Sequence, residues 1–298
     1  MKHIPVLLNE VLKTLEGAPL PGVSGTTGIS GKTIIDCTFG AGGYSRAFLE
    51  RGASVIAFDR DPSAAPAADA LTRQFGYDRF RFINQNFSGI SDLSKQYDAI
   101  VFDLGISSMQ IDQPARGFSF REDARLDMRM SMQGLTAAEL IRRFHDTEDT
   151  IGLAKILREY GDIRNARGLA KKILANPPET TFQLKGMVSN SRDVAPVFQA
   201  LRIAVNDEFG EIAGTLRDAV PALLRTYGIC ICVTFHSLED RIVKNIFREW
   251  TTVPGDPRLP AVEVMAPFKM LKTLTPSDVE IAGNPRARSA HLRAVMKL

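Results

Sequence analysis

A glycine-rich turn and a downstream carboxylate have the residue types and spacing to bind an adenosine. The turn, Phe39–Gly43, follows a run of apolar residues, and Asp59 closes the next such run. Glycines at a strand-to-helix turn let the backbone approach a ligand, and a carboxylate after the next strand can accept hydrogen bonds from both ribose hydroxyls. An isolated glycine turn would be weak evidence, but this combination predicts a site for S-adenosylmethionine.

Two phosphate-binding alternatives fail on their spacing. A dinucleotide fingerprint that starts at Gly40 would need glycine where Ser45 stands. The string 31–33, Gly-Lys-Thr, suggests a nucleoside triphosphate loop, but that motif needs glycine at the position of Thr26 and a helix afterwards. The turn is therefore expected to bind an adenosyl group that carries no phosphate.

A second carboxylate ends another apolar run. Residues 98–103 lead from Asp98 through an apolar stretch to Asp103, which a glycine and two serines follow. An exocyclic base amine is a poor nucleophile because its lone pair is delocalised, and an acceptor such as Asp103 could hold its N–H groups for in-line methyl transfer. Cytosine C5 chemistry needs a nucleophilic cysteine, normally after proline, and none of the three cysteines follows one.

Two further side chains leave alternatives open. Phe87 follows a predicted strand, where its ring could lie against an adenine or belong to the core. His236 ends a later predicted strand beside Ser237, which is expected to cap a helix. A catalytic and a structural role for His236 are about equally supported.

Alternating strand and helix signals must position these groups. The spacing is typical of parallel βαβ units in a doubly wound α/β sheet. The expected strands are 32–39, 54–59, 80–84 and 98–103, and the expected helices between them are 45–51 and 64–75.

The pattern changes in the middle of the chain, where almost no strand signal remains. Thr136 and Glu139 there have the spacing of a capping box. We expect a helical insertion at 111–205 within an α/β domain formed by 1–110 and 206–298. The last part of that domain is expected to contain a helical segment over 209–225, a strand at 228–235, a helix from Ser237, and a hairpin of 262–268 with 289–297.

The composition is that of an ordinary globular protein. The 298 residues are 44% hydrophobic and 24% charged, and the net charge of +3 does not by itself establish nucleic-acid binding. Three cysteines argue against a disulfide framework, and nothing completes a metal site, so buried thiols are expected. Residues 17–31 are expected to form a solvated loop. The absence of a signal peptide or a membrane span of ~20 residues predicts a cytoplasmic protein without a membrane partner.

Several strings, in order along nearly the whole chain, resemble the bacterial RsmH (MraW) family. The resemblance implies a Rossmann-like class I methyltransferase fold with a helical insertion and S-adenosyl-L-methionine as cofactor. It also implies methylation of N4 of a cytidine in the decoding region of 16S ribosomal RNA. The strings that carry it are 3–8, 36–43, 103–110, 116–120, 126–130, 235–241 and 284–289.

The same resemblance implies site residues, position by position. The family commonly has histidine where Tyr44 stands, which questions a side-chain contact there and leaves a backbone contact possible. Asp103 and His236 are the catalytic candidates. The implied cofactor contacts are Gly42, Gly43, Tyr44, Asp59, Phe87, Asp103 and Gln110.

The implied partner is 16S ribosomal RNA, within the small ribosomal subunit or an assembly intermediate, and a homodimer stays open. Arg116 and Phe118 in the insertion, with Arg286 and Arg288 near the C-terminus, are the candidate RNA contacts. A small-metabolite methyltransferase on the same fold is the alternative function. A non-enzymatic RNA-binding module is a third, against which the intact glycine turn argues.

Overall fold

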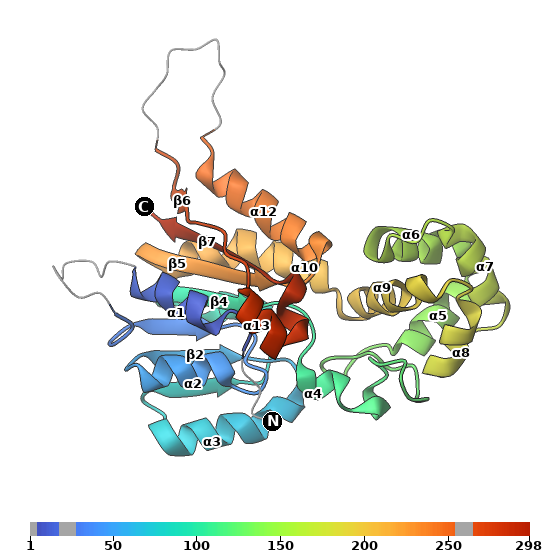
Figure 1. Cartoon of the computed structure of the whole chain (residues 1–298), viewed down its shortest axis with the longest axis horizontal. Helices are drawn as coiled ribbons and strands as arrows, with labels where there is room; N and C mark the ends of the chain where they lie inside the picture. The colour runs from blue at the N-terminus through green and yellow to red at the C-terminus, as the bar shows by residue number, and fades with distance from the viewer. Residues whose placement is uncertain (1–4, 18–27, 254–264) are drawn as a thin grey trace, which may run out of the picture. The chain divides into compact units, whose positions relative to one another are not determined.

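The computed structural model describes residues 5–17, 28–253 and 265–298. The chain divides into two compact units (Figure 1), a sheet unit formed by Met1–Gly105 and Gly210–Leu298 and a helical unit formed by Ile106–Phe209. The first boundary lies before the expected one, so that Gln110 belongs to the helical unit. None of the helices that the structure describes is long and apolar enough to cross a membrane.

The sheet unit contains a seven-stranded sheet in the order β3-β2-β1-β4-β5-β7-β6. Neighbouring strands from β3 to β5 are parallel, and β7 runs antiparallel to both β5 and β6. The predicted mostly parallel, doubly wound sheet is thus confirmed, and its order reverses between β1 and β4. The strands are β1 Thr33–Asp36, β2 Ser54–Phe58, β3 Phe80–Ile83, β4 Tyr97–Asp103, β5 Leu224–Thr234, β6 Phe268–Met270 and β7 His291–Lys297.

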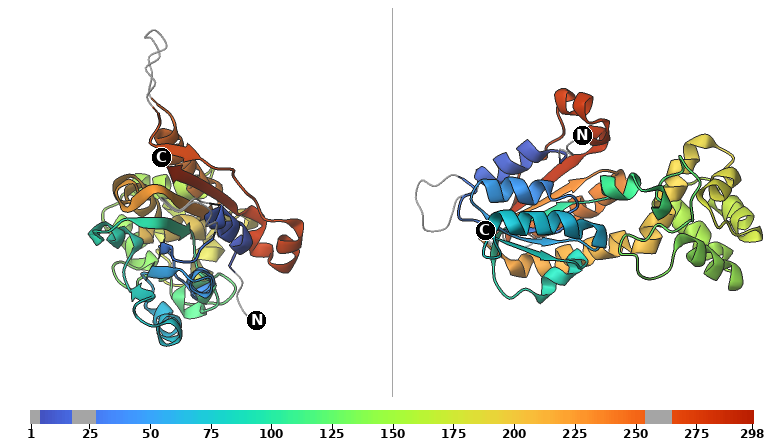
Figure 2. Two further views of the ribbon diagram at one scale, coloured as in Figure 1. Left: turned by 90° about the vertical axis from the view of Figure 1, so that its left-hand side faces the viewer. Right: turned by 90° about the horizontal axis from the view of Figure 1, so that it is seen from below.

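Helices cover both faces of this sheet (Figures 1 and 2). Apolar side chains of α1, α2 and α3 form one core cluster with alternate residues of the strands, while α12 packs against β5, β6 and β7. The helices of the sheet unit are α1 Leu8–Glu16, α2 Gly43–Glu50, η1 Pro62–Ala64, α3 Ala65–Phe75, η2 Phe87–Asp92, α10 Glu208–Gly214, the π-helical η5 Thr215–Ala219, α11 Val220–Leu223, α12 Ser237–Thr251, α13 Asp278–Gly283 and η6 Pro285–Ser289.

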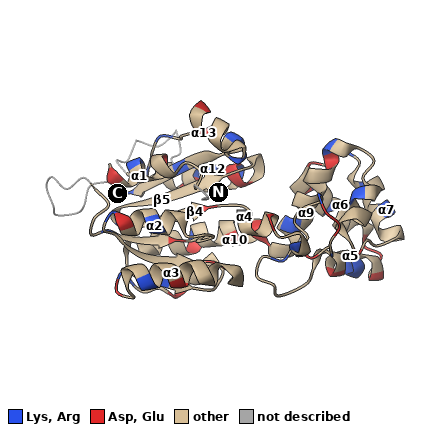
Figure 3. Ribbon diagram, turned by 60° about the horizontal axis from the view of Figure 1, so that its bottom comes forward, with Lys and Arg blue, Asp and Glu red and all other residues tan. Residues whose placement is uncertain are grey.

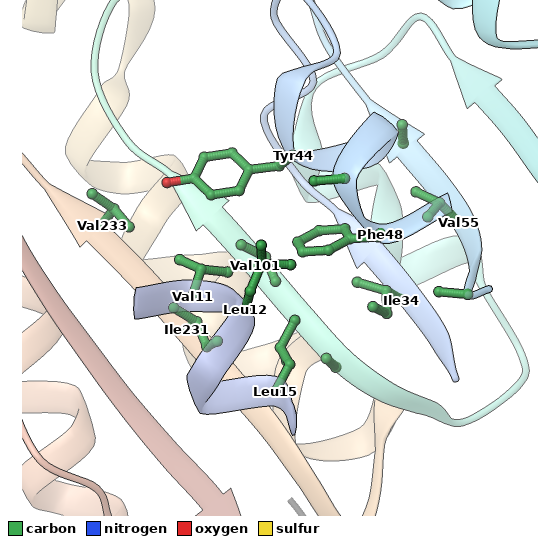
Figure 4. Close-up of a cluster of buried hydrophobic side chains, with 14 of the residues drawn as sticks. Val11, Leu12, Leu15, Ile34, Tyr44, Phe48, Val55, Val101, Ile231 and Val233 are labelled. Atoms are coloured by element: carbon green, nitrogen blue, oxygen red, sulfur yellow. The ribbon is translucent and has the colours of Figure 1, made fainter. Parts of the chain in front are cut away.

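The core beneath α1 and α2 explains their apolar spacing. Val11, Leu12 and Leu15 of α1 are buried against the strands, and Phe48 of α2 lies among them (Figure 4). These α1 positions repeat at three and four residues, so one helix face is apolar. Because Phe48 packs into this cluster, the same core holds α2 in place. The glycine turn at the start of α2 is thereby held as well.

Two expected elements differ from the structure. The strand expected at 228–235 begins already at Leu224, and its first residues include exposed Tyr227 in the left-handed region, with φ 62°. The polar, irregular start of β5 has no apolar alternation by which it could be recognised. The C-terminal hairpin is present, but its first strand is Phe268–Met270 instead of 262–268, of which 262–264 lie outside the described residues. Most of the expected loop 17–31 also lies outside them.

The helical unit has a core of its own, formed by side chains of α5, α6, α7, α8 and α9. The expected capping box is present, since Thr136 accepts from the Glu139 N–H and the Glu139 carboxylate accepts from the Thr136 N–H. The next helix, α6, ends at Gly161. The helices of this unit are α4 Ser108–Ile111, η3 Pro114–Arg116, α5 Ala137–Asp146, α6 Thr150–Gly161, α7 Ala166–Ala175, α8 Thr181–Met187, η4 Ser191–Asp193 and α9 Val194–Asn206.

Candidate functional site

Polar groups gather at one edge of the sheet. Asp36 and Asp103 are the last residues of β1 and β4, Asp59 directly follows β2, and His236 follows β5. These four strands are parallel, so their carboxyl ends share an edge, and the strand order reverses there. Open α/β sheets bind ligands in the crevice at such a reversal point.

The three glycines of the turn have different roles. Gly40, with φ 53°, faces open space, and its N–H donates to Asp59 Oδ2 at 2.6 Å. Gly42 has φ 79°, and a Cβ on it would lie 2.8 Å from the Phe39 ring. A Cβ on Gly43 would overlap the Pro5 ring. Gly42 and Gly43 are therefore required by the fold, and Gly40, which was not among the predicted cofactor contacts, offers the open approach to the backbone.

Asp59 organises the turn and retains acceptor capacity. Its Oδ2 accepts from the Gly40 N–H, and its Oδ1 accepts from the Asp61 N–H at 2.9 Å. Burial raises the pKa of this carboxyl, while the hydrogen bonds from Asp61 and Gly40 act in the opposite direction. Each carboxylate oxygen has a second lone pair, so the predicted contacts with two ribose hydroxyls are compatible with both bonds.

Tyr44 uses its side chain in the core. The ring is buried and stacks on Phe48 (Figure 4), with 6.1 Å between centroids. Its hydroxyl donates a hydrogen bond to the Val6 carbonyl. The Tyr44 side chain is thus already occupied by core contacts. Its backbone N–H lies in the first turn of α2, where N–H groups lack intrahelical partners, so only a backbone contact stays a prediction.

Phe87 also has a core position. It begins η2, is buried, and meets Phe102 of β4 edge to face at 5.6 Å between ring centroids. The structure therefore accounts for this ring without a ligand. A contact with an adenine remains a prediction.

Asp103 is the least satisfied of the acidic groups. Its N–H donates to Thr38 Oγ1 at 2.6 Å, but its carboxylate oxygen Oδ1 is buried and has no hydrogen-bond partner among the described residues. Burial raises the pKa of Asp103 well above its usual range, and the negative charges of Asp36 and Glu239 raise it further. Because an unsatisfied buried acceptor costs about 1–3 kcal/mol, the arrangement suits a ligand that brings a donor or a positive charge.

The Asp36 carboxyl is a neighbour that the sequence analysis did not single out. Its Oδ2 accepts from Ser45 Oγ at 2.6 Å and its Oδ1 from the Thr38 N–H at 3.2 Å. Burial raises the pKa of Asp36 to about 6 despite these hydrogen bonds. A polar residue closing the apolar strand just before the glycine turn was the signal that could have identified it.

His236 serves as a helix cap. Its Nδ1 accepts from the Glu239 N–H at 3.4 Å, and its Nε2 lies 2.8 Å from Glu239 Oε1. Glu239 Oε2 in turn accepts from the Phe235 N–H at 3.0 Å. His236, and not Ser237 as expected, is the N-cap of α12. This geometry gives His236 a structural role. A catalytic role for His236 stays a prediction.

Two of the predicted RNA contacts have structural roles in the helical unit, and their contact with RNA stays a prediction. Arg116 is buried, and its guanidinium donates to the carbonyls of Arg129 and Met130, both at 2.9 Å. Phe118 belongs to the core of the helical unit, and the Arg116 guanidinium lies 5.7 Å from its ring centroid. Both side chains hold the segment that opens this unit. Gln110 is buried there too, and its Oε1 accepts from the Ser107 N–H at 3.0 Å.

Arg116→Ala is therefore expected to destabilise the protein. Loss of two hydrogen bonds from a charged, buried group should lower the free energy of unfolding by about 2–3 kcal/mol. Chemical denaturation measures this free energy of unfolding. Arg121→Ala is the control, since Arg121 lies in the same segment with an exposed side chain and should change stability by less than about 0.5 kcal/mol. Equal stability of the two variants would contradict the structural role of Arg116.

The comparisons with known proteins identify the family of the chain. The model of the MraW methylase family matches residues 1–298. The chain belongs to the MraW methylase family. A protein named ribosomal RNA small subunit methyltransferase H from Rhizobium etli is 44% identical over 100% of this chain and 88% of its own length. A protein of the same name from Rickettsia bellii is 43% identical, with 99% of both chains covered.

Membership of the MraW methylase family confirms the methyltransferase activity and S-adenosylmethionine as the methyl donor. The residues at the sheet edge fit this group. Gly40 offers an open backbone approach, Asp59 has free lone pairs for a ribose, and the buried Asp103 Oδ1 lacks a partner among the described residues. A sulfonium cation suits an edge that is lined by carboxylates.

The predicted RNA contacts near the C-terminus of this MraW methylase remain accessible. Arg286 and Arg288 are exposed on η6. This turn leads directly into β7, whose first residue, His291, pairs with Thr234 at the carboxyl end of β5. The two arginines thus lie at the same edge of the sheet as Asp103. Arg293, by contrast, is bound by both carboxylate oxygens of Asp240 at 2.6 and 2.8 Å.

The cysteines take no part in this site. Cys37, Cys230 and Cys232 are buried, free thiols, as expected from their apolar surroundings. Burial raises the pKa of Cys37 and of Cys232 well above the usual range, so both remain protonated at neutral pH. A protonated thiol is a weak nucleophile.

Proposed function

We propose that this MraW methylase transfers a methyl group to the exocyclic N4 of a cytidine in the decoding region of 16S ribosomal RNA. The observation that carries the proposal is the buried Asp103 Oδ1, an acceptor without a partner among the described residues, at the carboxyl end of β4. The relatives from Rhizobium etli and Rickettsia bellii are both named as methyltransferases of small-subunit ribosomal RNA, which supports the substrate class.

In this proposal, Asp103 is the catalytic residue. Bound S-adenosylmethionine supplies a methyl carbon on a positively charged sulfur. Asp103 Oδ1 accepts a hydrogen bond from the N4 amine and holds it so that the nitrogen lone pair points at that carbon. The N–C bond forms as the C–S bond breaks, with its electron pair left on sulfur. The amine proton leaves afterwards, to Asp103 or to water.

Other residues bind the cofactor in this proposal. Asp59 accepts from the ribose hydroxyls, the backbone at Gly40 and Gly42 borders the methionine part, and Phe87 borders the adenine. Gly43, Tyr44 through its backbone N–H, and Gln110 are the other proposed cofactor contacts. His236 positions Glu239 and the start of α12 rather than touching the substrate. The substrate particle is the small subunit or an assembly intermediate, encountered in the cytoplasm, and a homodimer is compatible with the proposal.

Arg286 and Arg288 are proposed to bind RNA phosphates beside the reacting base. The Arg286→Ala/Arg288→Ala double variant should bind 16S RNA about tenfold more weakly at low salt. Loss of two phosphate contacts should also lower the slope of log affinity against log salt by about 1.5. Filter binding across a salt series measures both values, and calorimetry should show unchanged S-adenosylmethionine affinity.

The matched control removes two exposed positive charges at the opposite edge of the sheet. Arg73 lies in the last turn of α3, and Lys95 lies two residues before β4. The Arg73→Ala/Lys95→Ala variant has the same net charge as the arginine double variant. Equal RNA affinities for these two variants would show that only net charge matters and would remove Arg286 and Arg288 from the interface.

The substrate class is tested by offering labelled S-adenosylmethionine with small ribosomal subunits from cells that lack this activity. Parallel reactions contain free 16S RNA or a small-molecule extract from the same cells. We expect label in RNA. Label in small molecules, with none in RNA, would support the small-metabolite alternative and overturn the proposal. Helices of the helical unit carry many Lys and Arg residues (Figure 3), which favours the RNA.

A further inference from the structure

Two buried carboxyls close the adjacent strands β1 and β4. Asp36 is 1% exposed, and the Asp103 Oδ1 atom is buried without a hydrogen-bond partner among the described residues. Thr38 joins them, because its N–H donates to Asp36 Oδ1 at 3.2 Å and its Oγ1 accepts from the Asp103 N–H at 2.6 Å. The two acids therefore flank the place where the glycine turn and the β4 loop meet.

A third carboxyl stands beside them. Glu239, in the first turn of α12, is fully buried and bonds the Phe235 N–H through Oε2 at 3.0 Å. On its other side it faces His236. Burial raises the pKa of Asp103 most, and the charges of Asp36 and Glu239 raise it further. The charge of Asp59 raises the pKa of Asp36.

Two further titratable neighbours add no positive charge, and a third, His236, lies against Glu239. The buried hydroxyl of Tyr44 and the thiol of Cys37 have raised pKa values, to which the nearby carboxylates contribute, so both are neutral at neutral pH. All the charged groups that shift the pKa of Asp36 or of Asp103 are acidic. The carboxyls are thus arranged around a position where a cation would be stabilised.

We infer that Asp36 and Asp103, supported by Glu239, select the adenosyl ligand by charge, so that the site prefers cationic S-adenosylmethionine to the neutral S-adenosylhomocysteine that methyl transfer leaves. The two ligands differ by one methyl group and one positive charge on sulfur. In a site shielded from water, a carboxylate discriminates between them far more than it would in bulk solvent. Loss of the charge on transfer then weakens binding of the product and aids its release.

The same arrangement predicts a proton release that reports on the carboxyls directly. At neutral pH the raised pKa values keep a proton on this group of acids for part of the time. A bound sulfonium favours the ionised acids, so the proton passes to the buffer. Binding of S-adenosylhomocysteine, whose sulfur carries no charge, should release no protons.

Calorimetry on the full chain without RNA tests this inference. Titration with each ligand, in two buffers of different ionisation enthalpy, gives both dissociation constants and the number of protons released. We expect wild-type protein to bind S-adenosylmethionine more tightly and to release protons only with that ligand. Asp36→Asn, which keeps the side-chain shape, should reduce the ratio of the two dissociation constants by roughly tenfold.

Asp98→Asn is the matched control. Asp98 is also buried, on β4, but at its amino end, where it pairs with Arg225 at 3.0 Å. This variant should keep the wild-type ratio. Equal affinity of the wild type for both ligands, or equal proton release, would overturn the inference even if Asp36→Asn failed to fold. The inference rests on the cofactor assignment and not on the RNA substrate, so its failure with binding retained leaves the proposed function standing. Binding of neither ligand would overturn the cofactor assignment as well.

Discussion

Asp103→Ala should lower the rate of methyl transfer by about 10²–10³-fold, with saturating cofactor and RNA. Removal of a preorganised group that acts on the reacting atoms typically costs this much. Stability should change little, because the variant removes a buried carboxyl whose pKa is raised, which offsets the lost packing. Single-turnover kinetics give the rate, and chemical denaturation gives the stability.

Two further variants separate the acceptor from the fold. Asp103→Asn keeps an acceptor oxygen and should retain more activity than Asp103→Ala. Asp98→Asn changes the same residue type at the other end of β4 and should leave the transfer rate within about threefold of wild type. Wild-type rates in Asp103→Ala would remove Asp103 from the reaction, and equal losses at Asp98 would indicate a general effect on β4.

Gly42→Ala should strongly destabilise the protein. The left-handed backbone costs a residue with a Cβ about 1–2 kcal/mol, and a contact of 2.8 Å with the Phe39 ring adds about 1–3 kcal/mol. We expect the free energy of unfolding to fall by about 3 kcal/mol. The affinity for S-adenosylmethionine should fall as well, because the turn must shift. Denaturation and calorimetry measure the two effects.

Gly76→Ala isolates the backbone contribution. Gly76 has φ 81°, close to the 79° of Gly42, but a Cβ on it would meet nothing within 4 Å. This variant should lose only about 1–2 kcal/mol and bind the cofactor normally. A Gly42→Ala variant as stable as Gly76→Ala would show that the Phe39 ring moves aside freely. That result would contradict the tight packing of Gly42 against Phe39.

Local patterns were sufficient to predict most of the sheet unit. Apolar runs that end in Asp36, Asp59 and Asp103 identify parallel strands, since both faces of such strands are buried. The glycine turn and the capping box at Thr136 follow from local backbone requirements. The shared edge of the sheet then follows from the parallel βαβ connections.

Tertiary contacts explain what the sequence could not predict. Arg116 and Arg286 have similar surroundings in the sequence, yet Arg116 is buried against two carbonyls and Arg286 is exposed. Only the fold decides which charge is structural. Similarly, Tyr44 turns to the core because Val6, far along the chain, offers a carbonyl. The role of Glu239 depends on α12 and on the end of β5.

The most direct test of the central claim is the identity of the nucleoside that this MraW methylase produces. Small subunits are treated with the protein and isotopically labelled S-adenosylmethionine, and their 16S RNA is digested and analysed by mass spectrometry. We expect labelled N4-methylcytidine, from a single fragment of the decoding region, and far less of it in the same time with Asp103→Ala. Label on C5 of cytosine or on a ribose oxygen, or undiminished N4 label with Asp103→Ala, would contradict it.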